Sequence, residues 1–188
     1  MVRPVLLTRH GETAWNALGR LQGHTDIELN DVGRAQASAL AASFGASDVA
    51  NVWTSDLARA RETGAIVAAA LGLAEPRIDP ELRERHFGVF EGLTRDEIAT
   101  QHPEAWRAWR EHTAAPPGGE PRDAAIARMT RALTRLAGDD GGPVLVISHG
   151  GVMRLWLMEV LGATVPLVAN GTTYVVEHDG SAFRARLR

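Results

Sequence analysis

The stretch Val5-Leu6-Leu7-Thr8-Arg9-His10-Gly11 decides the fold, because the same pattern returns near the other end of the chain as Val144-Leu145-Val146-Ile147-Ser148-His149-Gly150. Continuous apolar runs of this length are typical of strands that are buried on both faces of a parallel sheet. In such sheets, ligands bind beyond the carboxyl ends of the strands. Two strands that run in the same direction would therefore bring both imidazoles to one crevice. The glycine after each histidine lets another group approach the backbone closely.

The composition is that of one enzyme-sized globular domain. At 188 residues, the chain can bury roughly 70% of the surface that it exposes when unfolded. A net charge of −3 gives no reason to expect a nucleic acid or an anionic membrane as partner. Cysteine is absent, which excludes disulfides, thiolate metal sites and a thiol nucleophile. No apolar stretch approaches the ~20 residues of a membrane span, and the N-terminus has no signal-peptide pattern, so we expect a cytoplasmic protein.

Strand and helix signals alternate along the chain. Besides the two runs that precede His10 and His149, strands are expected at 49–54, 77–79, 172–178 and 182–187, the last two as a hairpin. Helices are expected at 31–44, 56–71, from 94, from 103, and at 123–137 and 151–161. This order predicts an α/β fold, a single three-layer α/β/α domain over residues 1–188 with a central, mostly parallel sheet.

Two local details of the helices follow from the sequence. Asn30-Asp31 and Ser55-Asp56 offer side-chain caps for the first and the second helix. The first helix should bury the face that carries Val32, Ala35, Ala39, Leu40 and Phe44.

Residues that can bind an anion gather in four clusters. The first is 9–13 with Asn16 and Gln22-Gly23, the second is 55–63 with Arg59, the third is 82–88 with Glu84, and the fourth is 148–151 with Arg154 one helical turn further on. A guanidinium group can donate two parallel hydrogen bonds to phosphate oxygens and neutralise their charge. A neutral imidazole can attack phosphorus, and nearby arginines lower the pKa of a histidine such as His10. The four clusters contain no metal-ligand set, and together they suit a tetrahedral dianion.

The series RHGETxxN…QG…SDLxRAxxT…LxExxFGxxEGLT…SHGG resembles the histidine phosphatase superfamily, in its phosphoglycerate mutase-like branch and closest to its short phosphatase-type members. The match extends from Arg9 to the turn at His149. The resemblance implies a phosphoglycerate mutase-like fold. It also implies a metal-independent phosphomonoesterase that needs no cofactor, forms a phosphohistidine intermediate and releases inorganic phosphate from a small phosphorylated metabolite.

The resemblance also implies a role for each matching residue. His10 would be the nucleophile, and Glu84 would protonate the leaving oxygen and then activate water. The clamp on the phosphoryl oxygens would consist of Arg9, Arg59 and His149. The pocket would be completed by Asn16, Gln22, Gly23 and Gly150.

Several alternatives are weighed against these roles. The two histidines could bind a metal, although Arg9 and Arg59 would repel a cation. Glu12, Glu81 and Glu91 compete with Glu84 as proton donor, and Glu12 suits an orienting role better.

Two other functions also remain open. A phosphoglycerate mutase is the runner-up, because 84–88 looks like the mutase version of that motif. The segment of residues 109–112 argues against a mutase, because it contains one arginine where a mutase would be expected to have a basic pair. The other is a non-catalytic module that binds a phosphorylated ligand, against which the four intact clusters argue.

The substrate itself is not readable from the sequence, nor is the oligomeric state. Residues 85–120 would form the wall that selects a substrate. The residues whose part in recognition stays open are Arg20, Arg85, His86, Arg95, Trp106, Trp109 and Arg110. Of these, Trp106 and Trp109 are expected to belong to a core, and Arg20 and Arg85 could contact substrate at the rim.

Overall fold

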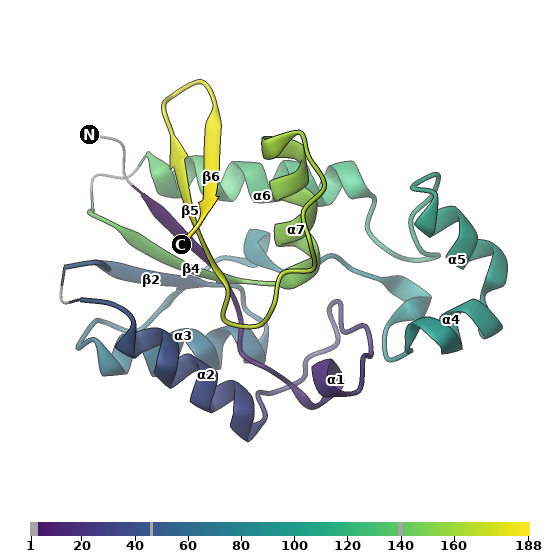
Figure 1. Ribbon diagram of the computed structural model, residues 1–188, viewed down its shortest axis with the longest axis horizontal. Coiled ribbons are helices and arrows are strands. Elements are labelled where there is room, and N and C mark those ends of the chain that lie inside the picture. The colour runs from purple at the N-terminus through teal and green to yellow at the C-terminus, as the bar shows by residue number, and fades with distance from the viewer. Residues whose placement is uncertain (1–3, 46, 139–140) are drawn as a thin grey trace.

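Six strands form one sheet in the computed structural model, which describes residues 4–45, 47–138 and 141–188. Their order is β3-β2-β4-β1-β5-β6 (Figure 1). Four strands run parallel, namely β1 (Val5–Arg9), β2 (Asn51–Thr54), β3 (Arg77–Ile78) and β4 (Val144–Ser148). The two that complete the sheet, β5 (Thr173–His178) and β6 (Phe183–Leu187), are antiparallel and form the expected C-terminal hairpin.

The two runs that end in His-Gly are direct neighbours in this sheet. Strands β1 and β4 pair in parallel, with Val5 opposite Val144 and Arg9 opposite Ser148. The next residue on each strand is the histidine, and the His10 amide donates a 3.0 Å hydrogen bond to the Ser148 carbonyl oxygen. The prediction that the pattern would bring both imidazoles to one edge of a parallel sheet is therefore confirmed.

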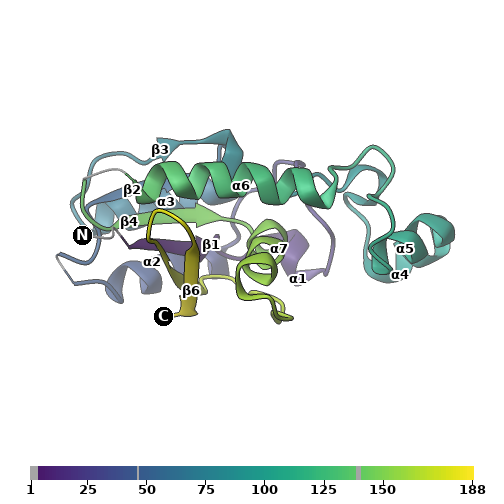
Figure 2. The ribbon, with the colours of Figure 1, turned by 90° about the horizontal axis from the view of Figure 1, so that it is seen from above.

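Helices cover both faces of the sheet. Figures 1 and 2 show α2 (Asp31–Ala42) and α3 (Ala58–Ala70) on one face, and α6 (Arg122–Ala137) and α7 (Gly150–Leu161) on the other. Every residue of β4 is buried. Leu145 and Ile147 pack towards α2 and α3, whereas Val144 and Val146 pack towards α6 and α7. This confirms the three-layer α/β/α architecture. None of the helices in the described part of the chain is long and apolar enough to span a bilayer, and the cytoplasmic location stays a prediction.

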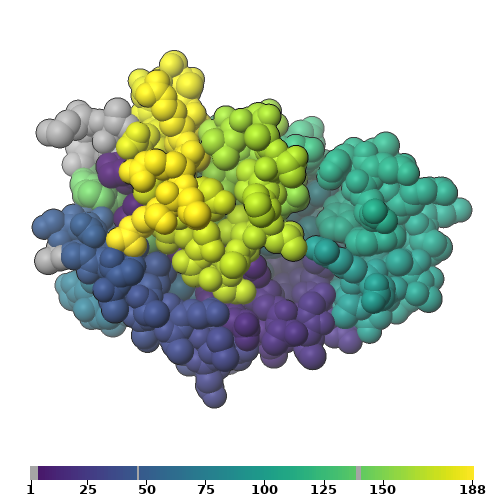
Figure 3. Space-filling view, in the orientation of Figure 1, coloured from purple at the N-terminus to yellow at the C-terminus, as the bar shows by residue number. Residues whose placement is uncertain are grey.

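The remaining elements are short. They are α1 (Ala14–Ala17), α4 (Arg95–Gln101), α5 (Pro103–Arg110) and the 3₁₀ turns η1 (Pro80–Leu82) and η2 (Gly88–Phe90). We call residues 88–120 the terminal lobe. Figure 3 shows this lobe in teal, with the surface hollowed where it meets the purple α1 segment and the green α7.

The terminal lobe has an aromatic core of its own. Trp106 and Trp109 lie half-buried against Phe87 and Phe90, and the Phe90 and Trp109 ring centroids are 5.8 Å apart. As expected, the two tryptophans belong to a core.

The predicted buried face of α2 is partly right. Leu40 and Phe44 are buried as expected, but Val32, Ala35 and Ala39 are exposed. In their place the helix buries Gly33, Ala37 and Ala41. The reason is the close approach of small residues, because α2 lies against α3 and against the turn after β1. A glycine and two alanines on one face permit such an approach, whereas a helix that buried Val32 would have to lie further away.

The predicted cap of α3 is also wrong. The helix begins at Ala58, its N-cap is Leu57, and no side chain of that residue caps it. Its first amide donates instead to Asp26 Oδ1, 2.7 Å away. Ser55 and Asp56 do not cap because both are used elsewhere, as a partner of His149 and as a partner of Arg83. The other expected cap, Asn30, is confirmed, and the helix expected from residue 94 begins at a Thr94 cap.

Gly33 offers a test of the close contact between α2 and the turn after β1. A Cβ placed on Gly33 would lie 2.1 Å from the Glu12 carbonyl oxygen. In a helix, Gly→Ala ordinarily stabilises by roughly 0.5–1 kcal/mol. Here we expect Gly33→Ala to lower the free energy of unfolding by about 1–3 kcal/mol, because backbone must move to admit the methyl group. Urea unfolding measures the difference.

The matched control is Ser38→Ala on the exposed face of the same helix, which should leave stability unchanged or slightly higher. A Gly33→Ala protein as stable as this control would show that the turn after β1 can yield without cost.

Candidate active site

His10 lies immediately after β1 and is 2% exposed. Its Nδ1 is 2.6 Å from the Gly11 carbonyl oxygen. A carbonyl oxygen can only accept, so Nδ1 carries the proton and the lone pair is on Nε2. Burial holds the His10 pKa well below its usual value, and the positive charges of Arg59 and Arg9 lower it further. The residue is therefore a neutral imidazole with a free electron pair, the form that a nucleophile requires.

His149 follows β4 and is fully buried, with its ring centroid 5.0 Å from that of His10. Arg59 Nε donates to its Nδ1 at 3.2 Å. Because Nδ1 accepts, Nε2 carries the proton and donates to Ser55 Oγ, 2.7 Å away. Burial and the neighbouring Arg59 hold the His149 pKa well below its usual value. Both ring nitrogens are thus bonded within the protein, and the bond to Arg59 is the longer of the two.

Arg59, in the first turn of α3, is a completely buried cation. It donates to the Thr25 and Gly23 carbonyl oxygens at 3.0 and 2.8 Å. Burial lowers its pKa to about 10. A guanidinium with this pKa stays charged at neutral pH, so α3 brings a fixed positive charge to the two histidines.

Arg9, the last residue of β1, is the second cation. One terminal nitrogen donates to the Val168 carbonyl oxygen at 2.6 Å, and burial lowers the pKa of the guanidinium. Its Nε is buried and has no partner among the described residues. A buried donor without a partner costs about 1–3 kcal/mol. Since Gly150 lies against this nitrogen, so that a Cβ there would be 3.0 Å away, the free N–H is located at the start of α7.

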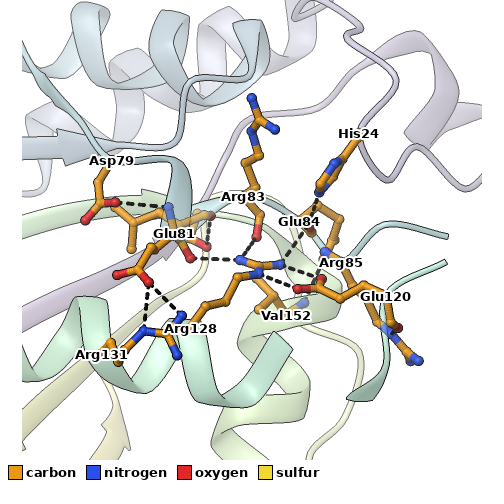
Figure 4. Close-up of polar contacts among 12 residues, drawn as sticks. His24, Asp79, Glu81, Arg83, Glu84, Arg85, Glu120, Arg128, Arg131 and Val152 are labelled. Atoms are coloured by element: carbon orange, nitrogen blue, oxygen red, sulfur yellow. Dashed lines mark hydrogen bonds and ion pairs between the residues drawn. The ribbon is translucent and has the colours of Figure 1, made fainter. Parts of the chain in front are cut away.

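Glu84 lies at the same end of α7, although it comes from the turn after η1. Its carboxylate accepts from the backbone amides of Gly151 and Val152 at 2.8 and 2.7 Å, and from that of Arg85 at 2.8 Å. Figure 4 shows the carboxylate directed at Val152. The residue is 8% exposed. A Cβ on Gly151 would lie 2.7 Å from Glu84 Oε1, so the second glycine after His149 is what admits the carboxylate.

Asn16 and Gln22 present polar groups from the segment between β1 and α2. Asn16 Oδ1 accepts from the Thr13 amide and from Asn170 Nδ2, both at 3.2 Å. These bonds occupy the oxygen, which leaves the amide nitrogen as the group that Asn16 can offer to a ligand. Gln22 is 6% exposed, and its Oε1 has no partner among the described residues. Gly23, by contrast, uses its carbonyl oxygen to hold Arg59.

The other carboxylates considered from the sequence are held elsewhere. Glu12 Oε1 accepts from Asn30 Nδ2 at 2.8 Å, in keeping with the orienting role expected of it. Glu81 pairs with arginines of α6, and Glu91 accepts from the backbone amides of His24, Thr25 and Phe87.

Several basic residues named from the sequence lie in other contacts. Arg154 donates to the Val165 carbonyl oxygen at 2.7 Å, so its sequence proximity to His149 does not make it a partner of that histidine. Arg20 is bonded to the Gly92 carbonyl oxygen and to Glu97, which ties α1 to α4. Arg85 Nε donates to the Glu120 carbonyl oxygen, and Arg110 lies over the Trp106 ring.

Two residues close to this site were missed from the sequence, and a third, Ser55, was expected to play another part. Asn170 donates to the His10 carbonyl oxygen at 2.9 Å and lies in the loop before β5, where no motif marks it. Ser55 was read as a helix cap. Arg128 donates to the Glu84 carbonyl oxygen from α6, where the helical pattern made it look like one of several surface arginines.

The charges of the site favour an anion. Two buried guanidinium groups and two neutral imidazoles are accompanied by one carboxylate, Glu84, and the start of α7 adds its positive dipole end. Among residues 4–45, 47–138 and 141–188, no three or more His, Cys, Asp or Glu side chains are grouped so as to hold a metal ion. The arrangement can bind a compact dianion, attack it with His10 and exchange a proton through Glu84.

Comparison with known proteins gives a consistent result. Residues 5–188 match the model of the histidine phosphatase superfamily (branch 1). The chain is 43% identical to phosphoglycerate mutase-like protein 4 of Arabidopsis thaliana, over 80% of this chain and 67% of that protein. It is 38% identical to a metal-independent phosphoserine phosphatase of the same plant, over 87% of this chain and 71% of that one. A mycobacterial glucosyl-3-phosphoglycerate phosphatase, solved in complex with VO3, superposes with a TM-score of 0.84 at 33% identity and covers 98% of this chain and 97% of its own. The chain belongs to the histidine phosphatase superfamily, as the motif series indicated.

Proposed function

We propose that this phosphatase hydrolyses a small phosphomonoester in two steps, with His10 as the residue that carries the phosphoryl group between them. The observation that carries the proposal is the neutral, buried His10 between two guanidinium groups, one of which has an unpaired N–H. The relatives named as phosphatases of phosphoserine and of glucosyl-3-phosphoglycerate support the same reaction class.

In the first step, His10 Nε2 attacks phosphorus, a nitrogen–phosphorus bond forms, and the bond from phosphorus to the ester oxygen breaks. Arg9 offers its free Nε, and Arg59 can exchange its long bond to His149 for one to a phosphoryl oxygen. The Asn16 amide would then donate to a further phosphoryl oxygen. The His149 Nδ1 that Arg59 releases would join the clamp once it takes up a proton, which the bound dianion favours. Such fixed charges stabilise the in-line transition state without having to reorganise.

Glu84 is the group that donates and then accepts the proton in the two steps. It enters the first step as the carboxylic acid, protonates the departing ester oxygen and is left as a carboxylate. In the second step it accepts a proton from water as that water attacks phosphorus, and the bond to His10 breaks to release inorganic phosphate. Its location at the start of α7 supports this role, because the same helix end faces the bound phosphoryl group.

We further propose that no metal ion is needed. The charges of Arg9 and Arg59 and the Gly150 amide supply the stabilisation that a divalent cation supplies in other phosphatases. The relative named as a metal-independent phosphoserine phosphatase supports this part of the proposal.

A mutase remains the second candidate, because the relative at 43% identity is named phosphoglycerate mutase-like. A mutase returns the phosphoryl group to a second hydroxyl and excludes water, and it must hold a second acidic group while doing so. Arg110, the arginine in the segment where a basic pair would be expected, lies over the Trp106 ring. This use of Arg110 favours the phosphatase.

The first prediction concerns His10. Wild-type protein mixed with a labelled phosphomonoester in excess EDTA should yield, after a quench, a protein-bound phosphate that is labile in acid and stable in base. His10→Ala should lose turnover and labelling because no other side chain in the site carries a free nucleophilic pair. His112→Asn, an exposed histidine at φ 60°, is the control and should label normally.

Label on a serine or an aspartate would refute the nucleophile, and activity that disappears in EDTA and returns with a divalent ion would refute metal independence. Chasing the labelled protein with 3-phosphoglycerate separates the two candidates, because a mutase would give a bisphosphate or 2-phosphoglycerate, whereas a phosphatase gives inorganic phosphate.

The second prediction concerns Glu84. Glu84→Gln cannot donate a proton, so kcat/KM should fall by about 10²–10⁴-fold with an alkyl phosphate, whose alkoxide leaves poorly. With p-nitrophenyl phosphate the loss should be far smaller, because that phenolate leaves without protonation. Arg59→Ala is the comparison and should harm both substrates alike, since Arg59 binds the transferred group. Equal losses for both substrates in Glu84→Gln would show that another group is the acid.

The third prediction concerns pH. In the unfolded chain His10 and His149 take up protons near pH 6.5, whereas the folded site keeps both neutral well below that pH. The unfolded state therefore binds more protons than the folded state as the pH falls from 7.5 to 5.5, and stability must fall over that range. Urea unfolding in a buffer free of phosphate should show a lower midpoint at pH 5.5, and a shallower pH dependence in His10→Ala. A midpoint that does not change would contradict the buried neutral histidines.

A further inference from the structure

Arg128, in the middle of α6, uses all five of its N–H donors within the protein. Nε and one terminal nitrogen bind the two oxygens of Glu120 at 2.7 and 2.9 Å. The remaining three donors reach backbone carbonyl oxygens, those of Glu81 at 2.8 Å, Arg83 at 2.7 Å and Glu84 at 3.0 Å. The side chain is 12% exposed. Figure 4 shows the guanidinium at the centre of this network.

These contacts determine the path of the turn that ends at Glu84. In the turn that follows η1, three carbonyl oxygens are directed at one point. Buried carbonyl oxygens are stable only when hydrogen-bond donors are present. Arg128 supplies a donor to all three, and His24 Nε2 lies 2.9 Å from the Glu84 oxygen as a second partner. With its backbone held in this way, Glu84 can reach the amides of Gly151 and Val152, which belong to a different element.

Glu120 completes the support from the other side of the turn. Its carboxylate binds Arg128 in a bidentate manner, its amide donates to the His86 carbonyl oxygen at 2.8 Å, and its own carbonyl oxygen accepts from Arg85. The residues on both sides of Glu84 are therefore bonded to Glu120 or to Arg128. The catalytic turn is held by a buried ion pair between the terminal lobe and α6.

We propose that Arg128 is a positioning residue for the proton-transfer step, and that it acts by holding the backbone of Glu84 so that the carboxylate stays at the start of α7. This inference rests on the acid–base role proposed above for Glu84. Arg128 does not contact the phosphoryl group, so the grip on phosphate by Arg9, Arg59 and the histidines does not depend on it.

Lysine cannot replace arginine in this role. A lysine ammonium keeps the positive charge but has three donors and no planar fork, whereas the network needs two bonds to Glu120 and three to carbonyl oxygens. Arg128→Lys therefore separates geometry from charge. The next arginine on α6 offers a matched control, because Arg131 binds the side chain of Glu81 at the surface and is 61% exposed. Pairs of that kind contribute little.

The experiment compares kcat/KM for an alkyl phosphate and for p-nitrophenyl phosphate in Arg128→Lys, Arg131→Lys and wild type. This constant reports the steps up to phosphoryl transfer and is not affected by slow dephosphorylation. Arg128→Lys should lose about 10²-fold with the alkyl phosphate, the usual consequence of a misplaced reacting group, and much less with p-nitrophenyl phosphate. The inhibition constant of inorganic phosphate should be unchanged, as should every value for Arg131→Lys.

The double variant Glu84→Gln/Arg128→Lys decides whether Arg128 acts through Glu84. If it does, the double variant should lose no more activity on the alkyl phosphate than Glu84→Gln alone. Additive losses, or equal losses on both substrates in Arg128→Lys, would overturn the inference while leaving the role of Glu84 intact. If Glu84→Gln itself shows no dependence on the leaving group, the proposed function fails instead.

Circular dichroism and thermal unfolding verify that each variant is folded. Should Arg128→Lys not fold, Glu120→Gln takes its place, because it leaves the arginine present but removes the charged bidentate partner. Glu120→Gln should then show the same selective loss on the alkyl phosphate, and a uniform loss on both substrates would overturn the inference.

Discussion

Two guanidinium groups buried beside two neutral imidazoles are the constraint on which the rest of the structure depends. Burying one cation is expensive unless it is paired, and here the charge of Glu84 is the one that most favours the charged forms of Arg9 and Arg59. Much of the surrounding backbone is arranged to reduce this cost. The carbonyl oxygens of Gly23, Thr25 and Val168 accept from the two guanidinium groups. The Arg9 Nε–H that these carbonyls do not satisfy is left for a ligand, and the two positive charges favour an anion there.

The sheet register and the glycines that follow β4 make this arrangement possible. Parallel pairing of Arg9 with Ser148 places the two histidines side by side, and the shared position of β1 and β4 at the centre of the sheet keeps them away from water. A side chain at Gly150 would meet Arg9, and one at Gly151 would meet Glu84. The absence of side chains at Gly150 and Gly151 therefore makes room for the Arg9 guanidinium on one side and the Glu84 carboxylate on the other.

The sequence predicted those parts of the molecule that a local pattern encodes. The apolar runs before His10 and His149 determine two buried parallel strands, and the motif series indicated His10, Arg59 and Glu84 before any geometry was known. The errors share a cause, which is that a side chain served a distant partner. Ser55 looks like a helix cap but bonds to His149, 94 residues away, and α2 turned Gly33 inward because backbone from the turn after β1 lies against it. The role of Arg128 could not be predicted for the same reason. Its carbonyl partners lie 44 to 47 residues away, and no local sequence pattern indicates such contacts.

The site consists of two parts with separate supports. The groups that would hold phosphate come from β1, β4 and α3 and are fixed by the central sheet, whereas Glu84 is held by α6 and by Glu120 at the end of the terminal lobe. Every phosphomonoester presents the same dianion to the first part but a different leaving oxygen to the second. Because the segment that holds Glu84, the proposed proton donor, is continuous with the lobe beside the hollow in Figure 3, a change in the lobe would alter both the wall that a substrate is expected to meet and the position of Glu84. Selectivity in such a site can therefore change while the binding of the phosphoryl group stays constant. The bidentate ion pair between Glu120 and Arg128 is the contact that keeps the two parts of the site in a fixed relative position.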